Sequence, residues 1–92
     1  MATLHLIRES ALKNNFTHYL SLVNKEDGII FLDDGCYNLS TPWLLTLNNT
    51  NITVISEHMQ ARGLSIPDHI NQISAQQLPA QLFNYENNIT WS

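Results

Sequence analysis

The most constraining feature of this sequence is an unbroken apolar run, Ile29-Ile30-Phe31-Leu32, which ends abruptly at Asp33-Asp34-Gly35. A short apolar run between polar turns is the pattern of a β-strand that is buried on both faces. Such a strand lies inside a sheet that is covered by helices on its two sides. The run therefore predicts an α/β protein.

The rest of the chain alternates between strand and helix patterns. Apolar residues recur at three- and four-residue steps between residues 11 and 23, which places them on one side of a helix. In chain order we predict strands at residues 3–8, 29–32, 52–56 and 70–74, a further short strand at 89–91, and helices at 11–23, within 40–49, at 57–62 and from about 77 onward. This alternation predicts one domain over residues 1–92, a three-layer α/β/α arrangement around a small, mostly parallel sheet of four to five strands.

Composition excludes several classes of function. The chain has 4 Lys+Arg against 8 Asp+Glu, a net charge of −4, and no cluster of basic residues, which disfavours direct binding to nucleic acid. No apolar run approaches the length needed to span a bilayer, and the N-terminus lacks a signal-peptide pattern. We therefore expect a cytoplasmic protein with no membrane contact.

Sites in parallel sheets form beyond the carboxyl ends of the strands, which directs attention to three loops. These are Glu9-Ser10, residues 33–36 and residues 56–58. No glycine-rich phosphate loop occurs among them, so nucleotide binding is disfavoured and no cofactor is expected. We interpret the adjacent Asp33 and Asp34 as turn residues rather than as an acid/base pair.

Cys36 is the single cysteine and the one candidate nucleophile. It lies where a strand ends and near a helix start, a place that can stabilise a thiolate. The neighbouring Asp33 and Asp34 oppose a thiolate, and no second cysteine is present to form a redox pair. A small buried residue is the favoured interpretation of Cys36, and a reactive thiol is the alternative.

The histidines and tryptophans complete the set of candidate residues. The four histidines, at positions 5, 18, 58 and 69, show no metal-ligand spacing, so we expect no metal site and interpret each as a surface or interface residue. We place Trp43 in the core. Trp91 lies one residue from the end of the sequence, where an indole is hard to bury, so we predict that it anchors an interface.

Four stretches of the sequence resemble the TusB/DsrH family, small subunits of bacterial sulfur-relay complexes. They are the opening Leu-His strand with its Ser at residues 4–10, the apolar strand ending in Asp-Gly at 29–35, the acidic residue followed by Ala-Arg-Gly within 56–64, and the terminal Trp91. The Ala-Arg-Gly-Leu block and the terminal Trp are the most specific of these features.

The resemblance implies a DsrEFH-like fold and a role as the B subunit of a TusBCD-type complex, a dimer of heterotrimers. Its partners would be the sibling C and D subunits and, indirectly, the carrier TusA and TusE. In that pathway a persulfide sulfur passes through the D subunit and yields 2-thiouridine at the tRNA wobble position. The B subunit is a scaffold without a cofactor, so a non-catalytic subunit is expected, with Arg62 and Trp91 at its interfaces.

One departure from the family pattern bears on the pathway branch. Sulfur-oxidising DsrH proteins carry a cysteine in the first helix, and the matching position here is Tyr19. The tRNA branch is therefore the leading hypothesis. The alternatives are a DsrH-like subunit of a sulfur-oxidation complex, a persulfide carrier that uses Cys36, and a free-standing homo-oligomeric regulator.

Overall fold

The protein is built around one five-stranded, all-parallel sheet. The computed structural model describes residues 2–9, 23–24, 26–40, 51–66 and 70–91. The strands are β1 (Thr3–Ile7), β2 (Gly28–Phe31), β3 (Asn51–Ile55), β4 (Asn71–Ile73) and β5 (Asn87–Trp91), and their order across the sheet is β4-β3-β2-β1-β5. The predicted α/β fold with a small parallel sheet is confirmed.

The period of two along each strand sends side chains to opposite faces of the sheet. On β2, Ile29 and Phe31 join one buried cluster and Ile30 joins another. The apolar run is thus a central strand, buried on both faces as its composition requires. The strand predicted at 70–74 is β4, which lies at an edge of the sheet and has only three residues.

Four helical segments lie among the described residues: two short 3-10 helices, η1 (Asp33–Ser40) and η3 (Ala75–Gln77), and the α-helices α2 (Ser56–Ala61) and α3 (Leu78–Phe83). Pro79 occupies the first turn of α3, as predicted. Gly63 follows α2 with φ of 65°, a left-handed conformation that glycine adopts without strain.

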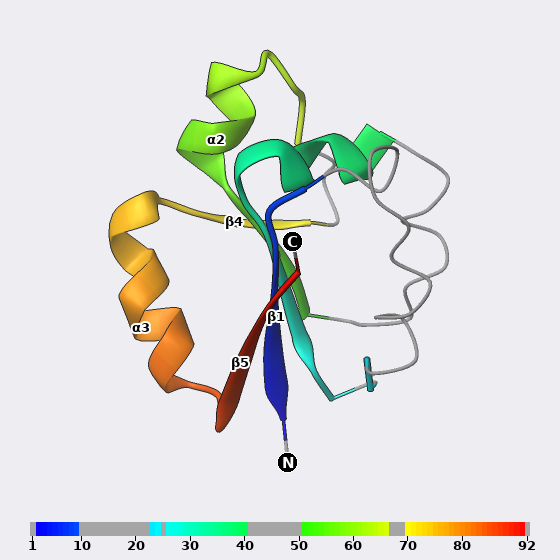
Figure 1. Cartoon of the computed structure of the whole chain (residues 1–92). Coiled ribbons are helices and arrows are strands. Elements are labelled where there is room, and N and C mark those ends of the chain that lie inside the picture. The colour runs from blue at the N-terminus through cyan, green and yellow to red at the C-terminus, as the bar shows by residue number, and fades with distance from the viewer. Residues whose placement is uncertain (1, 10–22, 25, 41–50, 67–69, 92) are drawn as a thin grey trace.

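α3 lies in the crossover connection between β4 and β5, on one face of the sheet. Because β4 and β5 lie at opposite edges, the connection between them crosses the whole sheet, and Figure 1 shows α3 standing on one side of it. Leu78 and Leu82 of α3 pack on the cluster that contains Leu4 and Ile30. The predicted helix 11–23, apart from its last residue Val23, which is not helical, and most of the region 40–49 lie outside the described residues.

η1 differs from the expectation for the segment after β2. The sequence predicts a helix that starts near residue 40, whereas helical turns begin directly at Asp33. The left-handed Asp33, with φ of 51°, turns the chain sharply enough for η1 to start there. Gly35 then packs so closely against β1 that an added Cβ would lie 2.7 Å from the carbonyl carbon of Ile7.

Trp91 lies in the core of the isolated chain, contrary to the expectation that its indole is hard to bury. β5 pairs with β1 along its full length, so that Trp91 stands beside Ile7 in the register, and its side chain is 0% exposed. The indole belongs to the buried cluster with Ile29 and Phe31. The indole is buried because the edge strand β5 pairs with β1. The position of Trp91 near the end of the sequence gives no sign of this pairing. Trp43 lies outside the described residues.

Candidate functional site

A charged pocket of about 340 Å³ lies at the carboxyl edge of the sheet. It is lined by Arg8 and Glu9 after β1, by Asp33 and Asp34 after β2, and by Arg62 after α2. The lining holds three carboxylates and two guanidinium groups. All three loops predicted to form a site contribute to this region, because His58 of α2 also contacts Asp33.

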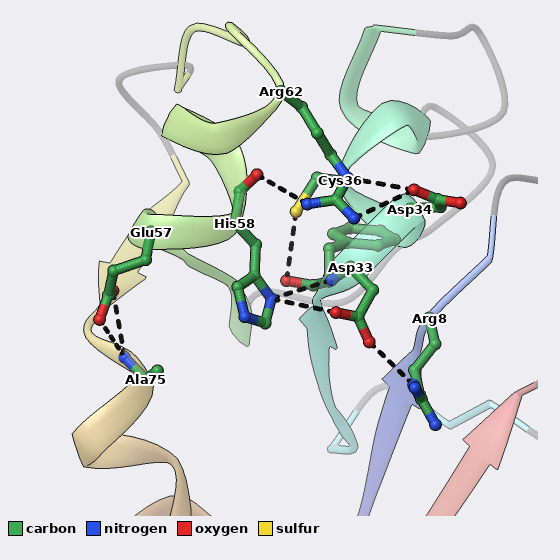
Figure 2. A network of polar contacts seen from close by, with 9 residues as sticks. Arg8, Asp33, Asp34, Cys36, Glu57, His58, Arg62 and Ala75 are labelled. Atoms are coloured by element: carbon green, nitrogen blue, oxygen red, sulfur yellow. Dashed lines mark hydrogen bonds and ion pairs between the residues drawn. The ribbon is translucent and has the colours of Figure 1, made fainter.

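Asp33 is the centre of the polar network at this edge (Figure 2). Its carboxylate Oδ2 accepts a hydrogen bond of 2.9 Å from Arg8 Nε, and its backbone N–H donates to His58 Nδ1 at 2.9 Å. Asp is one of the residue types that tolerate a left-handed backbone, and here two neighbouring elements hold it in that conformation. The left-handed Asp33 fits the interpretation as a turn residue. Its contacts with Arg8 and His58 also connect the end of β1 with α2.

Arg62 ties α2 to η1. Its Nε lies 3.1 Å from Asp34 Oδ1, its Nη2 lies 3.1 Å from the same oxygen, and its Nη1 donates to the carbonyl oxygen of His58 at 3.2 Å. All three guanidinium nitrogens thus make contacts inside the chain, and the side chain is 22% exposed. That Arg62 also meets a partner remains a prediction.

Glu57 links α2 to the start of η3. Its carboxylate oxygens accept hydrogen bonds from the backbone N–H of Ala75 at 3.1 and 3.0 Å. The hydrogen bond from Ala75 is the main reason that the pKa of Glu57 is lowered from its ordinary value of 4.5. Glu57 is the acidic residue that precedes Ala-Arg-Gly in the sequence, and here it is used for a structural contact.

Cys36 is buried at 0% exposed, and its Sγ lies 3.8 Å from the carbonyl oxygen of Phe31. Burial raises the pKa of the thiol to about 11, although the positive charge of Arg62 acts to lower it. Thiolates are the reactive form of cysteine, and at this pKa few exist near neutral pH. The structure places Cys36 in the core.

A second polar network, which the sequence pattern does not predict, is buried in the sheet. His5 Nε2 lies 2.8 Å from Asp27 Oδ2, and Trp91 Nε1 donates to His5 Nδ1 at 3.1 Å. The interpretation of His5 as a surface or interface residue is wrong, since its side chain is 0% exposed. His5 shares its face of β1 with the buried Ile7, two positions along the strand, and this spacing was the available signal.

Asp27 anchors the buried network at the start of β2. Its carboxylate accepts backbone N–H bonds of 3.0 Å from Thr3 and from Asn24. Burial acts to raise the pKa of this carboxyl, but these two bonds and the His5 contact outweigh it, so the pKa lies below the ordinary 3.8. The carboxylate therefore stays charged in the core.

The described parts of the chain contain neither a metal-ligand cluster nor a membrane-spanning helix. There, no group of three or more His, Cys, Asp or Glu side chains could hold a metal ion. None of the helices described is long and apolar enough to cross a membrane. His18, His69 and Tyr19 lie outside those parts.

The fold and the site together define a small parallel α/β protein with a charged carboxyl edge and a buried thiol. A family model described as DsrH like protein matches residues 9–88. The chain therefore belongs to the DsrH-like family, which is the TusB/DsrH family of the resemblance noted above, and is a subunit of the sulfur-relay type. No curated protein matches the chain.

Proposed function

We propose that this protein is the B subunit of a TusBCD-type sulfur-relay complex, with a scaffold role in the 2-thiolation of the tRNA wobble uridine. It assembles in the cytoplasm with sibling C and D subunits, and TusA and TusE act on the complex without requiring a reactive group from this chain. The proposal extends the family membership, which by itself supports a sulfur-relay subunit in general.

The burial of Cys36 is the observation that carries the scaffold role. It is the single cysteine of the sequence, it is 0% exposed, and its pKa is raised to about 11. A persulfide carrier needs a thiolate that its donor and its acceptor can both reach. The chain is thus better suited to complete an assembly than to carry sulfur.

The carboxyl edge is the surface that we assign to the contact with a sibling subunit. Arg62 is held there by Asp34 and by the His58 carbonyl, so a partner would meet a side chain whose geometry is already set. Trp91 supports assembly indirectly in this proposal, because its buried indole holds β5 against β1.

Co-expression with tagged C and D subunits tests the assembly. We expect the chain to co-purify with both siblings and to elute with them as one species in size-exclusion chromatography. A matched control is Phe83→Ala, which changes an aromatic residue that is 88% exposed on α3, away from the carboxyl edge. A chain that stays monomeric in the presence of both siblings would end the proposal.

Thiol chemistry separates the scaffold from a Cys36 persulfide carrier. At a pKa of about 11, roughly one thiol in a thousand is ionised at about pH 8. We therefore expect a disulfide reagent to label Cys36 in the unfolded chain and not in the native one. Cys36→Ala should leave 2-thiouridine formation by the assembled complex intact, whereas loss of sulfur transfer in this variant would favour the carrier hypothesis.

A further inference from the structure

His58 lies near two groups of Asp33 that favour opposite protonation states of its Nδ1. Its Nδ1 lies 2.9 Å from the backbone nitrogen of Asp33 and 3.8 Å from the carboxylate oxygen Oδ1 of the same residue. The backbone N–H is a donor, so Nδ1 must offer a lone pair, and the imidazole is then neutral with its proton on Nε2. The carboxylate oxygen, in contrast, favours a protonated Nδ1.

We infer that His58 is a proton-controlled switch at the carboxyl edge of the sheet. In its neutral form, Nδ1 accepts the Asp33 N–H. When Nδ1 takes a proton from solvent, two N–H groups face each other, that hydrogen bond is lost, and the new N–H donates to Asp33 Oδ1 instead. The exchange takes place within one residue, because its amide and carboxylate both lie close to Nδ1.

Asp33 is well placed to convert this exchange into a change of local structure. Its left-handed φ of 51° sets the path from β2 into η1, and the bond to His58 is the contact that its backbone N–H makes. Its other carboxylate oxygen, Oδ2, is already held by Arg8 Nε. One oxygen is therefore left for a protonated His58, and the Arg8 contact is kept.

The charged groups around His58 leave Asp33 as its immediate partner among the described residues. On α2, Glu57 directs its carboxylate to the N–H of Ala75, and Arg62 engages the His58 carbonyl. On η1, the carboxylate of Asp34 is taken by Arg62. Figure 2 shows the imidazole pointing at Asp33, between these pairs.

The switch changes the charge of the surface that borders the pocket. Three carboxylates and two guanidinium groups line the pocket, a net charge of −1, and a proton on His58 adds a positive charge next to it. This inference rests on the proposed function and deepens it: docking of a sibling subunit at the carboxyl edge becomes dependent on pH through His58.

Nuclear magnetic resonance of the isolated, isotope-labelled chain tests the switch without any partner. From about pH 8 to about pH 5, we follow the ring nitrogens of His58 and the amide signal of Asp33. We expect Nδ1 to be the unprotonated nitrogen at the upper end, and the Asp33 amide signal to shift with the same midpoint as the His58 ring. A proton on Nδ1 at the upper end, or an Asp33 amide that ignores the His58 titration, would overturn the inference.

A matched variant isolates the role of the imidazole. His58→Asn places a carbonyl oxygen near the position of Nδ1, so it keeps an acceptor for the Asp33 N–H but does not titrate. The pH-dependent shift of the Asp33 amide should disappear in this variant. If the same shift persists, another group causes it and His58 is not the switch.

Assembly provides a separate arm that distinguishes the two proposals. Co-purification with the siblings should change between about pH 7.5 and about pH 6 for the wild type and not for His58→Asn. If no complex forms at either pH while the resonance titration succeeds, the proposed function fails and the switch stands. If the complex forms equally at both values, the coupling of the switch to docking is refuted.

Discussion

Two histidine–aspartate contacts connect separate elements of this protein, and they differ in burial. His5 and Asp27 are both 0% exposed and lie 2.8 Å apart, whereas His58 and Asp33 are 29% and 39% exposed and lie 3.8 Å apart. In the buried contact, every hydrogen-bonding atom of the imidazole has one partner, because the Trp91 N–H fills Nδ1. In the more exposed contact, Nδ1 of His58 lies near both the backbone N–H and the carboxylate of Asp33.

The difference teaches that the same pair of residue types serves stability in one place and adaptability in the other. A buried polar network stabilises the fold when all of its members are satisfied, and breaking it leaves unpaired groups in the core. A partly exposed pair is weakened by water and can rearrange at little cost. We therefore expect substitutions in the His5 network to cost far more stability than those at the carboxyl edge.

Trp91→Ala should have the largest effect. Removing a fully buried indole leaves a cavity and takes away the donor to His5, and such changes cost about 3–5 kcal/mol of unfolding free energy. Urea denaturation measures the loss. Phe83→Ala removes an aromatic side chain that is 88% exposed and should change stability by about 0.5 kcal/mol or less. Equal losses in the two variants would contradict the placement of Trp91 in the core.

Asp27→Asn should come next, at about 2 kcal/mol near neutral pH, because the charged acceptor of three hydrogen bonds is lost. The folded-state pKa of Asp27 lies below its ordinary 3.8, so its contribution is present above that value and is lost as the pH falls through the folded pKa. Unfolding measured at decreasing pH should show the wild type and the variant converging below about pH 4. A gap that stays constant down to low pH would rule out this account.

The sheet could be predicted from the sequence because its signals are local. The apolar run of β2 and the alternation of strand and helix patterns each occupy a few consecutive residues, and burial of β2 on both faces follows from them. The loops at the carboxyl edge followed from the parallel arrangement, which brings Glu9, Asp33 and His58 to one region.

The buried network could not be predicted in the same way, since it depends on contacts between distant parts of the chain. Trp91 meets His5 across 86 positions, and only the pairing of β5 with β1 brings them together. Likewise, the pairing of Arg62 with Asp34 depends on how α2 packs against η1. The residue types show which side chains can form hydrogen bonds and ion pairs, but their partners depend on the tertiary arrangement.

Arg62→Ala should have a smaller effect than either core substitution, about 1 kcal/mol or less, because the ion pair with Asp34 is partly exposed to solvent. Arg62→Lys keeps the charge but cannot reach Asp34 and the His58 carbonyl together, so it should fall between the wild type and Arg62→Ala. Denaturant midpoints compare the three proteins. A loss as large as that of Trp91→Ala would remove the contrast between the two regions.

Glu57→Gln should have the smallest effect, and it carries a distinct pH signature. The carboxylate receives the Ala75 N–H and its pKa is lowered from 4.5, so its contribution exists above that value and is lost as the pH falls through the folded pKa. Melting temperatures of the wild type and the variant should therefore differ near neutral pH and coincide in acid. If the variant melted like the wild type at every pH, the bond from Ala75 would contribute nothing, and α2 would be held by its other contacts, among them those of His58, Arg62 and Met59.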